Sequence, residues 1–249
     1  MTRAFHWLGV LCLVLISNSA IADNVCDQSS SATQYKFFDL KNRISFRNEG
    51  GLFDGGVCWW HSRFQRAAIY LARYAPEKQK PSPAQAQKIV HDLTSMNHVV
   101  EIPGFENLFD FSLAFEPQIQ KELDDWQLRD GFIFQQWARG LYGRSSLPPN
   151  EMKKRMSIIY SKFKKSLPGM WVMAQLPGIT SHALLIIDMK PNADGFDLSF
   201  IDSNAPNTTL ATSYHSGDRT VTAHGMVPYV GFNEDFVKIE KALKSSCHH

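Results

Sequence analysis

The sequence has few cysteines, little net charge and no long uncharged apolar run beyond its first residues. Four cysteines in 249 residues are too few for a disulfide scaffold, and they lack the spacing of a zinc ribbon. Because 26 basic residues face 24 acidic ones, no global field favours nucleic acid or a membrane surface. The chain instead holds 17 Phe, 7 Tyr and 6 Trp, which are enough for one sizeable core.

Residues 1–22 have the features of an export signal. Arg3 gives a positive start, residues 7–16 are apolar, and 20–22 (Ala-Ile-Ala) fit the small-x-small pattern that precedes a cleavage site. The apolar run is shorter than the ~20 residues needed to span a bilayer, which favours cleavage over an uncleaved anchor. We therefore expect the mature chain 23–249 to be secreted or periplasmic and to have no membrane attachment.

Export changes the cysteine count, because Cys12 leaves with the signal. Cys26 and Cys247 lie near the two ends of the mature chain, and chain termini often lie close together. A disulfide between them is therefore plausible in an oxidising compartment. Cys58 then remains without a disulfide partner, and such a thiol is either buried and inert or retained for its chemistry.

The mature chain shows no repeats and no long linker, which indicates a single domain. Its first part, about residues 50–168, is predicted to be helical, and its second part, about 169–249, to consist mainly of strands. Helices first and strands last predict an α+β fold in which a helical half packs on a mostly antiparallel sheet. The periodicity predicts helices over 58–74, 82–96, 116–140 and 150–165, strands over 170–176, 183–189, 196–201, 219–222 and 226–232, and a last helix ending near 243.

Cys58 opens the first of these helices, directly after a glycine-rich turn that ends at Gly55 and Gly56. Backbone N–H groups at a helix N-terminus are unpaired, and together with the helix dipole they stabilise negative charge. This position favours a nucleophilic thiolate, and the backbone N–H of Cys58 points where an oxyanion would develop. The glycines allow a substrate backbone to approach closely.

His182 begins an apolar strand, and Asp202 and Asn204 follow the next strand. If these two strands pair, the end of one lies beside the start of the other. Either Asp202 or Asn204 can then orient the imidazole of His182, which would act as the base toward Cys58. The sequence alone leaves the choice between the two open.

These residues resemble the papain-like cysteine peptidases. The chain has Cys-Trp at the head of a helix, Ser-His-Ala at the start of an apolar strand, and Asp-Ser-Asn after the following strand, in the family's order and with similar separations. The resemblance spans about residues 50–230 in layout. It implies a helical lobe headed by the Cys helix, a sheet lobe that carries the His, and a substrate cleft between them.

Two departures place the chain near distant members of that superfamily. The position six residues before Cys58, where the family has an oxyanion-hole Gln, is occupied by Leu52, so that Asn48 or a group elsewhere would have to substitute. An Asp as third member of the triad is more typical of secreted effector proteases, transglutaminases and peptidoglycan peptidases. We therefore assign the superfamily and not the papain family itself.

Other polar and aromatic residues near these motifs have competing interpretations. His61, one helical turn after Cys58, is a rival base, but it more often would lie beside the thiol as a supporting group. Trp59 belongs either to the core or to the roof of a cleft. We expect no metal and no cofactor, because the remaining histidines lack the spacing of ligands: His215, His224, His248 and His249.

The sequence thus predicts an exported thiol hydrolase that cleaves peptide or amide bonds in a protein or peptide substrate. The catalytic residues would be Cys58, His182 and Asp202 or Asn204. Two alternatives stay open. One is acyl transfer of the transglutaminase type, or cleavage of peptidoglycan cross-peptides, with the same triad. The other is a non-catalytic binding module on the same fold. No nucleic-acid partner is expected.

Overall fold

The computed structural model describes residues 30–51, 56–134, 144–165, 168–175, 181–221, 225–230 and 234–247. Its helices are α2 (Ser30–Phe38), the short 3-10 helix η2 (Leu40–Asn42), α3 (Cys58–Leu71), α4 (Pro83–Ser95), α5 (Leu108–Ala114), α6 (Glu116–Phe134), α8 (Pro149–Lys165) and α9 (Glu234–Cys247). Its strands are β1 (Ala72–Ala75), β2 (Val100–Pro103), β3 (Met170–Gln175), β4 (Ser181–Pro191), β5 (Gly195–Asp202), β6 (Thr209–His215) and β7 (Val227–Val230).

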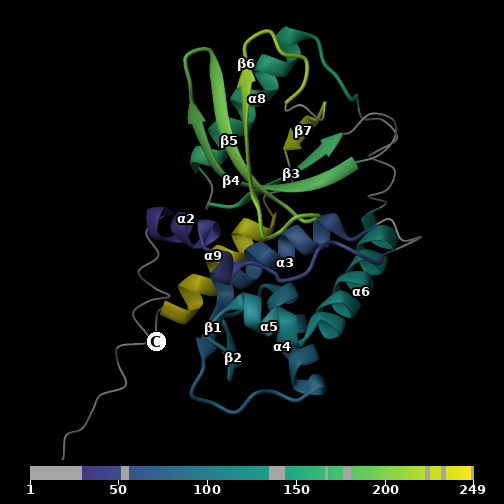
Figure 1. Ribbon diagram of the computed structural model, residues 1–249, viewed down its shortest axis with the longest axis vertical. Coiled ribbons are helices and arrows are strands. Elements are labelled where there is room, and N and C mark those ends of the chain that lie inside the picture. The colour runs from purple at the N-terminus through teal and green to yellow at the C-terminus, as the bar shows by residue number, and fades with distance from the viewer. Residues whose placement is uncertain are drawn as a thin grey trace, which may run out of the picture.

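The fold is α+β, as predicted, and its main sheet is antiparallel. Five strands form this sheet in the order β6-β5-β4-β3-β7. Figure 1 shows the sheet above a group of helices formed by α3, α4, α5 and α6. A separate parallel pair, β1 and β2, lies within the helical half and was not predicted.

Strand β4 is buried on both faces, which explains its uninterrupted apolar sequence. Ala183, Leu185 and Ile187 pack into the core of the helical half. Leu184 and Ile186, which point to the opposite face, pack into a second core with α8 and the other strands. β4 therefore joins the two halves of the molecule, and the residues at its start lie where the halves meet.

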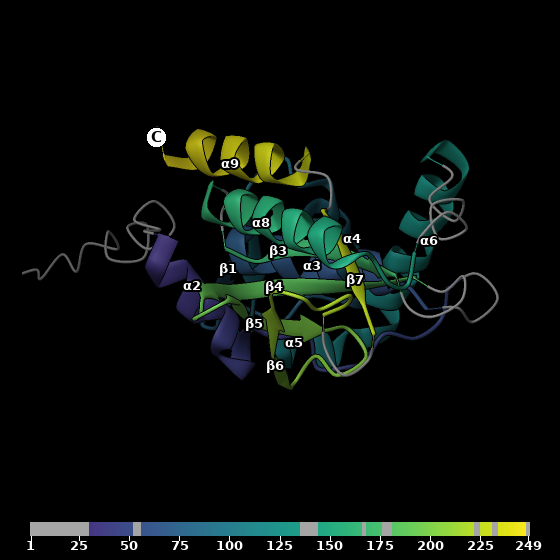
Figure 2. The same cartoon turned by 90° about the horizontal axis from the view of Figure 1, so that it is seen from above.

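The spatial halves do not follow the order of the chain. α8 packs on the sheet through its buried face of Met152, Met156 and Ile159, and Figure 2 shows it lying along the sheet. α9 returns to the helical half, where Ile239 and Ala242 join the core that contains α3. Residue 168 therefore separates mainly helical sequence from mainly strand sequence, but it does not separate the two packed halves of the molecule.

Helix α3 is nearly enclosed, and its two arginines are held by a buried carboxylate of α9. Asp235 accepts hydrogen bonds from Arg63 Nε at 2.8 Å and from Arg66 Nη2 at 2.7 Å. Arg63 also pairs with Asp130 of α6 at 2.8 Å. Buried guanidinium groups are costly unless they are paired, so these bonds fix α3 between α6 and α9.

Most predicted elements occur with small shifts at their ends. α4 begins as the sequence indicated, since Ser82 and Gln85 form a capping box ahead of Pro83. The helix predicted over 58–74 is α3, and it ends at Leu71 and not at Tyr74, because residues 72–75 form β1 and pair with β2. Of the described residues 219–221 in the predicted weak strand, only Val221 forms a bridge, with Met226.

Candidate active site

Cys58 is the first residue of α3, and its thiol is free. The helix is capped by Val57, which is buried and supplies no side-chain cap. The backbone N–H groups of the first turn are therefore not covered by a capping side chain, as binding of an anion at this end requires. The side chain of Cys58 is half-buried, so the thiol is screened from bulk water but remains accessible.

The imidazole of His182 is oriented by Asp202. β4 and β5 pair so that Leu184 lies opposite Asp202, which makes His182 a diagonal neighbour of Asp202 on the same face of the sheet. His182 Nε2 lies 2.6 Å from Asp202 Oδ1, and that oxygen also accepts the backbone N–H of Asn204 at 2.8 Å. The carboxylate of Asp202 is thus itself held in place.

The other side of His182 contacts Cys58. A hydrogen bond and a charge interaction with the thiol of Cys58 are among the causes that raise the pKa of His182. Burial disfavours a charged His182, but the hydrogen bonds to Asp202 and Cys58 and the charges of these two groups outweigh it and raise the pKa of His182 to about 10. His182 therefore keeps its proton at neutral pH.

Asp202 is the charged partner in this arrangement. Burial alone would raise the pKa of Asp202, but its hydrogen bond to His182, the charge of His182 and the Asn204 N–H lower it. Asp202 therefore stays ionised at neutral pH, as a residue that stabilises an imidazolium must be.

His61 lies beneath the pair as a neutral group. Its side chain is buried, and Nε2–H donates to the carbonyl oxygen of Phe46 at 3.1 Å. Burial lowers the pKa of His61 to about 4, against smaller opposing contributions from this hydrogen bond and from Asp202. The thiol of Cys58 acts on the pKa of His182 and not on that of His61, so His182 is the candidate base.

Asn48 and Asn204, both candidates from the sequence, are bonded to each other. Asn48 Nδ2 donates to Asn204 Oδ1 at 3.0 Å, and Asn48 Oδ1 accepts the backbone N–H of Val57. Asn204 thus contacts Asp202 through its backbone and Asn48 through its side chain, while Asp202 contacts His182. Both polar atoms of the Asn48 side chain are engaged in this link, and a role of Asn48 in an oxyanion hole stays a prediction.

Trp59 is part of the core. It is buried, and its ring stacks on that of Trp60 with centroids 6.1 Å apart. Trp60 in turn donates its indole N–H to Asp130 at 3.0 Å. These aromatic rings fix the first turn of α3 from the side of the helical half, so that Cys58 has a rigid support.

A cavity of about 400 Å³ lies beside Asn48 and Asn204. Its other lining residues are Arg47, Glu49 and Gly50. Gly50 begins the glycine-rich turn, but Arg47 and Glu49 were not predicted, because they lie in a segment whose sequence has no regular pattern. The cavity adjoins the residues that hold Asp202, so it offers space next to the candidate site.

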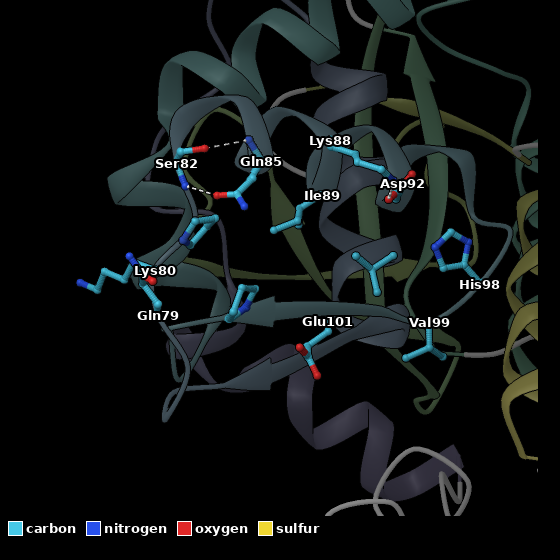
Figure 3. A pocket seen from close by; sticks show the side chains of 13 residues that line it. Gln79, Lys80, Ser82, Gln85, Lys88, Ile89, Asp92, His98, Val99 and Glu101 are labelled. Carbon is cyan, nitrogen blue, oxygen red and sulfur yellow. Dashed lines mark hydrogen bonds and ion pairs between the residues drawn. The ribbon is translucent and has the colours of Figure 1, made fainter.

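A second hollow, of about 690 Å³, lies between α4 and β2 (Figure 3). Figure 3 shows Lys88, Ile89 and Asp92 of α4 on one side and Val99 and Glu101 on the other. None of the candidate catalytic residues lines it.

Several predictions lie outside the described residues: the signal 1–22, Cys26 and Leu52, and also the side chain of Cys247. The structure therefore does not bear on the Cys26–Cys247 bridge or on the position that carries Leu52. Within the described residues, none of the helices combines the length and apolar character needed to cross a bilayer.

Comparison of the chain with protein-family models, with curated proteins and with solved structures gave no match.

Proposed function

We propose that this chain is an exported thiol hydrolase that cleaves peptide or amide bonds, with a papain-like arrangement of its helical and sheet halves. The observation that carries the proposal is one continuous series of contacts. Cys58 at the head of α3 bonds to His182, and His182 bonds to Asp202 at 2.6 Å. A thiol, a base in contact with it and a carboxylate that orients the base are the components of nucleophilic catalysis by cysteine.

The proposed reaction has two steps. The Cys58 thiolate attacks the carbonyl carbon, and a C–S bond forms while the uncapped N–H groups at the start of α3 stabilise the oxyanion. His182 donates its proton to the leaving amine as the C–N bond breaks, which leaves a thioester. His182 then accepts a proton from water while the water oxygen forms a C–O bond to the thioester carbon. The C–S bond breaks, the carboxylic acid leaves, and the Cys58 thiolate beside a protonated His182 is restored.

Labelling of Cys58 with iodoacetamide at pH 6 tests the proposal without a known substrate. A free cysteine thiol with a pKa near 8.5 is only about 0.3% thiolate at that pH, and a neighbouring imidazolium favours the reactive thiolate. We expect the His182→Ala variant to react roughly a hundredfold more slowly than the wild type. The matched control is His215→Ala, since His215 forms a similar but exposed pair with Asp194, at 2.7 Å.

Turnover is then sought by incubating peptide mixtures with the wild type and with Cys58→Ser, and by identifying new termini by mass spectrometry. Cleavage by the wild type alone supports a hydrolase. Products that carry an added amine instead indicate acyl transfer. An inert Cys58 whose labelling rate is the same in His182→Ala would refute catalysis and leave a non-catalytic binding module.

A further inference from the structure

The segment Asn42–Asn48, which we call the strap, lies against α3. Two of its backbone groups bond to one side chain of that helix. Gln65 Oε1 accepts the backbone N–H of Ile44 at 2.7 Å, and Gln65 Nε2 donates to the carbonyl oxygen of Asn42 at 2.6 Å. Gln65 is buried, so both bonds are protected from water.

The strap remains bonded to α3 up to the start of that helix. One turn before Gln65, His61 donates to the carbonyl oxygen of Phe46 at 3.1 Å. One turn earlier again, the side chain of Asn48 accepts the backbone N–H of Val57, the residue before the nucleophile. Gly56 allows this contact, because it has a φ of 78° and a Cβ there would lie 2.5 Å from Asn48 Nδ2.

The end of the strap also bonds to the loop that follows β5. Asn48 donates its backbone N–H to the carbonyl oxygen of Ser203 at 2.7 Å and its side-chain amide to Asn204 Oδ1 at 3.0 Å. Asn204 in turn donates its backbone N–H to Asp202. Asn48 therefore connects the residue before the thiol with the residues directly after the carboxylate.

Three further bonds attach the strap to the same loop and to the first residue of β6. The buried Arg43 donates to the carbonyl oxygen of Pro206 at 3.1 Å and to Thr209 Oγ1 at 2.6 Å. Asn207 Nδ2 donates to the carbonyl oxygen of Ser45 at 3.3 Å. The strap is thus fixed along its length, and Asn48 is the part of it nearest to the reacting groups.

We propose that Asn48 is a positioning residue that sets the start of α3, and with it Cys58, in register with Asp202 and His182. This inference rests on the proposed function, because it concerns the alignment of the same three groups. Asn48 does not need to touch a substrate for this role. Reacting groups must be aligned closely, since a displacement of about 1 Å can cost on the order of a hundredfold in rate.

The test measures the rate of Cys58 alkylation by iodoacetamide between pH 4 and pH 9 in the full chain. The titratable group that interacts with the thiol is His182, which in turn interacts with Asp202 and His61. In Asn48→Ala, we expect the acid limb of the profile to move up by about one pH unit, which lowers the rate below the midpoint about tenfold. A purely structural substitution elsewhere would leave this limb where it is.

Two more variants make the test independent of any folding defect. Asn204→Ala removes only the side-chain bond to Asn48 at an exposed position, and we expect a smaller shift in the same direction. Asn207→Ala is the matched control, because it removes another amide bond between the strap and the loop, away from Val57. We expect its profile to follow that of the wild type.

The outcomes separate the two proposals. Suppose that the pH profile of Cys58 alkylation differs between the wild type and His182→Ala, while the profiles of Asn48→Ala and Asn204→Ala match that of the wild type. The positioning role is then overturned, and the proposed function stands. A shift of equal size in Asn207→Ala would also overturn it, because the effect would then belong to the strap in general. If the wild type and His182→Ala have the same pH profile of Cys58 alkylation, the proposed function fails and this inference fails with it.

Discussion

The hydrogen bond between His182 and Asp202 provides the sharpest test of the charge arrangement. Asp202→Asn keeps an oxygen that can accept from Nε2 but removes the negative charge. A hydrogen bond to a charged group contributes about 1.5–3 kcal/mol and a neutral one about 0.5–1.5 kcal/mol, so the difference is about 1–1.5 kcal/mol. Both side chains are largely buried, with exposed fractions of 11% and 20%, so screening by water is limited. About one pKa unit should be lost, which takes the pKa of His182 from about 10 to about 9.

The measurement is a pH titration of the His182 ring followed by NMR in protein with isotope-labelled histidine. In the wild type, we expect His182 to keep its proton through neutral pH and to lose it near pH 10. The control is Asp194→Asn beside His215, where both groups are exposed and the shift should be smaller. A wild-type His182 that titrates near pH 6.5, or a midpoint unchanged in Asp202→Asn, would refute the reasoning.

Two further predictions concern stability. Asp235→Asn leaves the buried guanidinium groups of Arg63 and Arg66 without their shared counter-ion, so we expect urea denaturation to show a loss of about 3–5 kcal/mol; a loss below about 1 kcal/mol would mean that the pair contributes little. Ser82→Ala removes the side-chain half of the capping box with Gln85, and thermal and urea denaturation should show a loss of about 1 kcal/mol, whereas an unchanged midpoint would show that this helix end is held by other contacts.

Local signals were sufficient for much of the fold. Ser82 followed by Pro83 marks a helix start through its own backbone chemistry, and α4 begins there. The apolar run after His182 predicted a buried strand, because only a strand covered on both faces lacks polar positions. The pairing of two neighbouring strands predicted that Asp202 or Asn204 would lie near His182, and in the structure Asp202 makes this contact.

The missed parts depend on contacts between residues far apart in the chain. β6 has only Tyr214 buried, so its sequence carries no apolar alternation, and its pairing with β5 decides its structure. The sequence of residues 72–75 continues the helical pattern of α3, and only their pairing with β2 makes them a strand. The strap has no periodicity at all, because hydrogen bonds to α3 and to the loop after β5 determine its path, with the bond from Asn48 to Asn204 spanning 156 residues.

The buried ion pair between α3 and α9 has a consequence for the order in which the site is completed. Arg66, on the helix that carries the thiol, is separated by 169 residues from the carboxylate that neutralises it. During synthesis the ribosome therefore releases the helix that carries Cys58 long before the counter-ion of Arg66 exists. Until α9 docks, α3 would have to bury an uncompensated positive charge, which is strongly unfavourable. A nascent chain thus carries Cys58 in an unfinished setting, and the docking of the last helix acts as the step that matures the site.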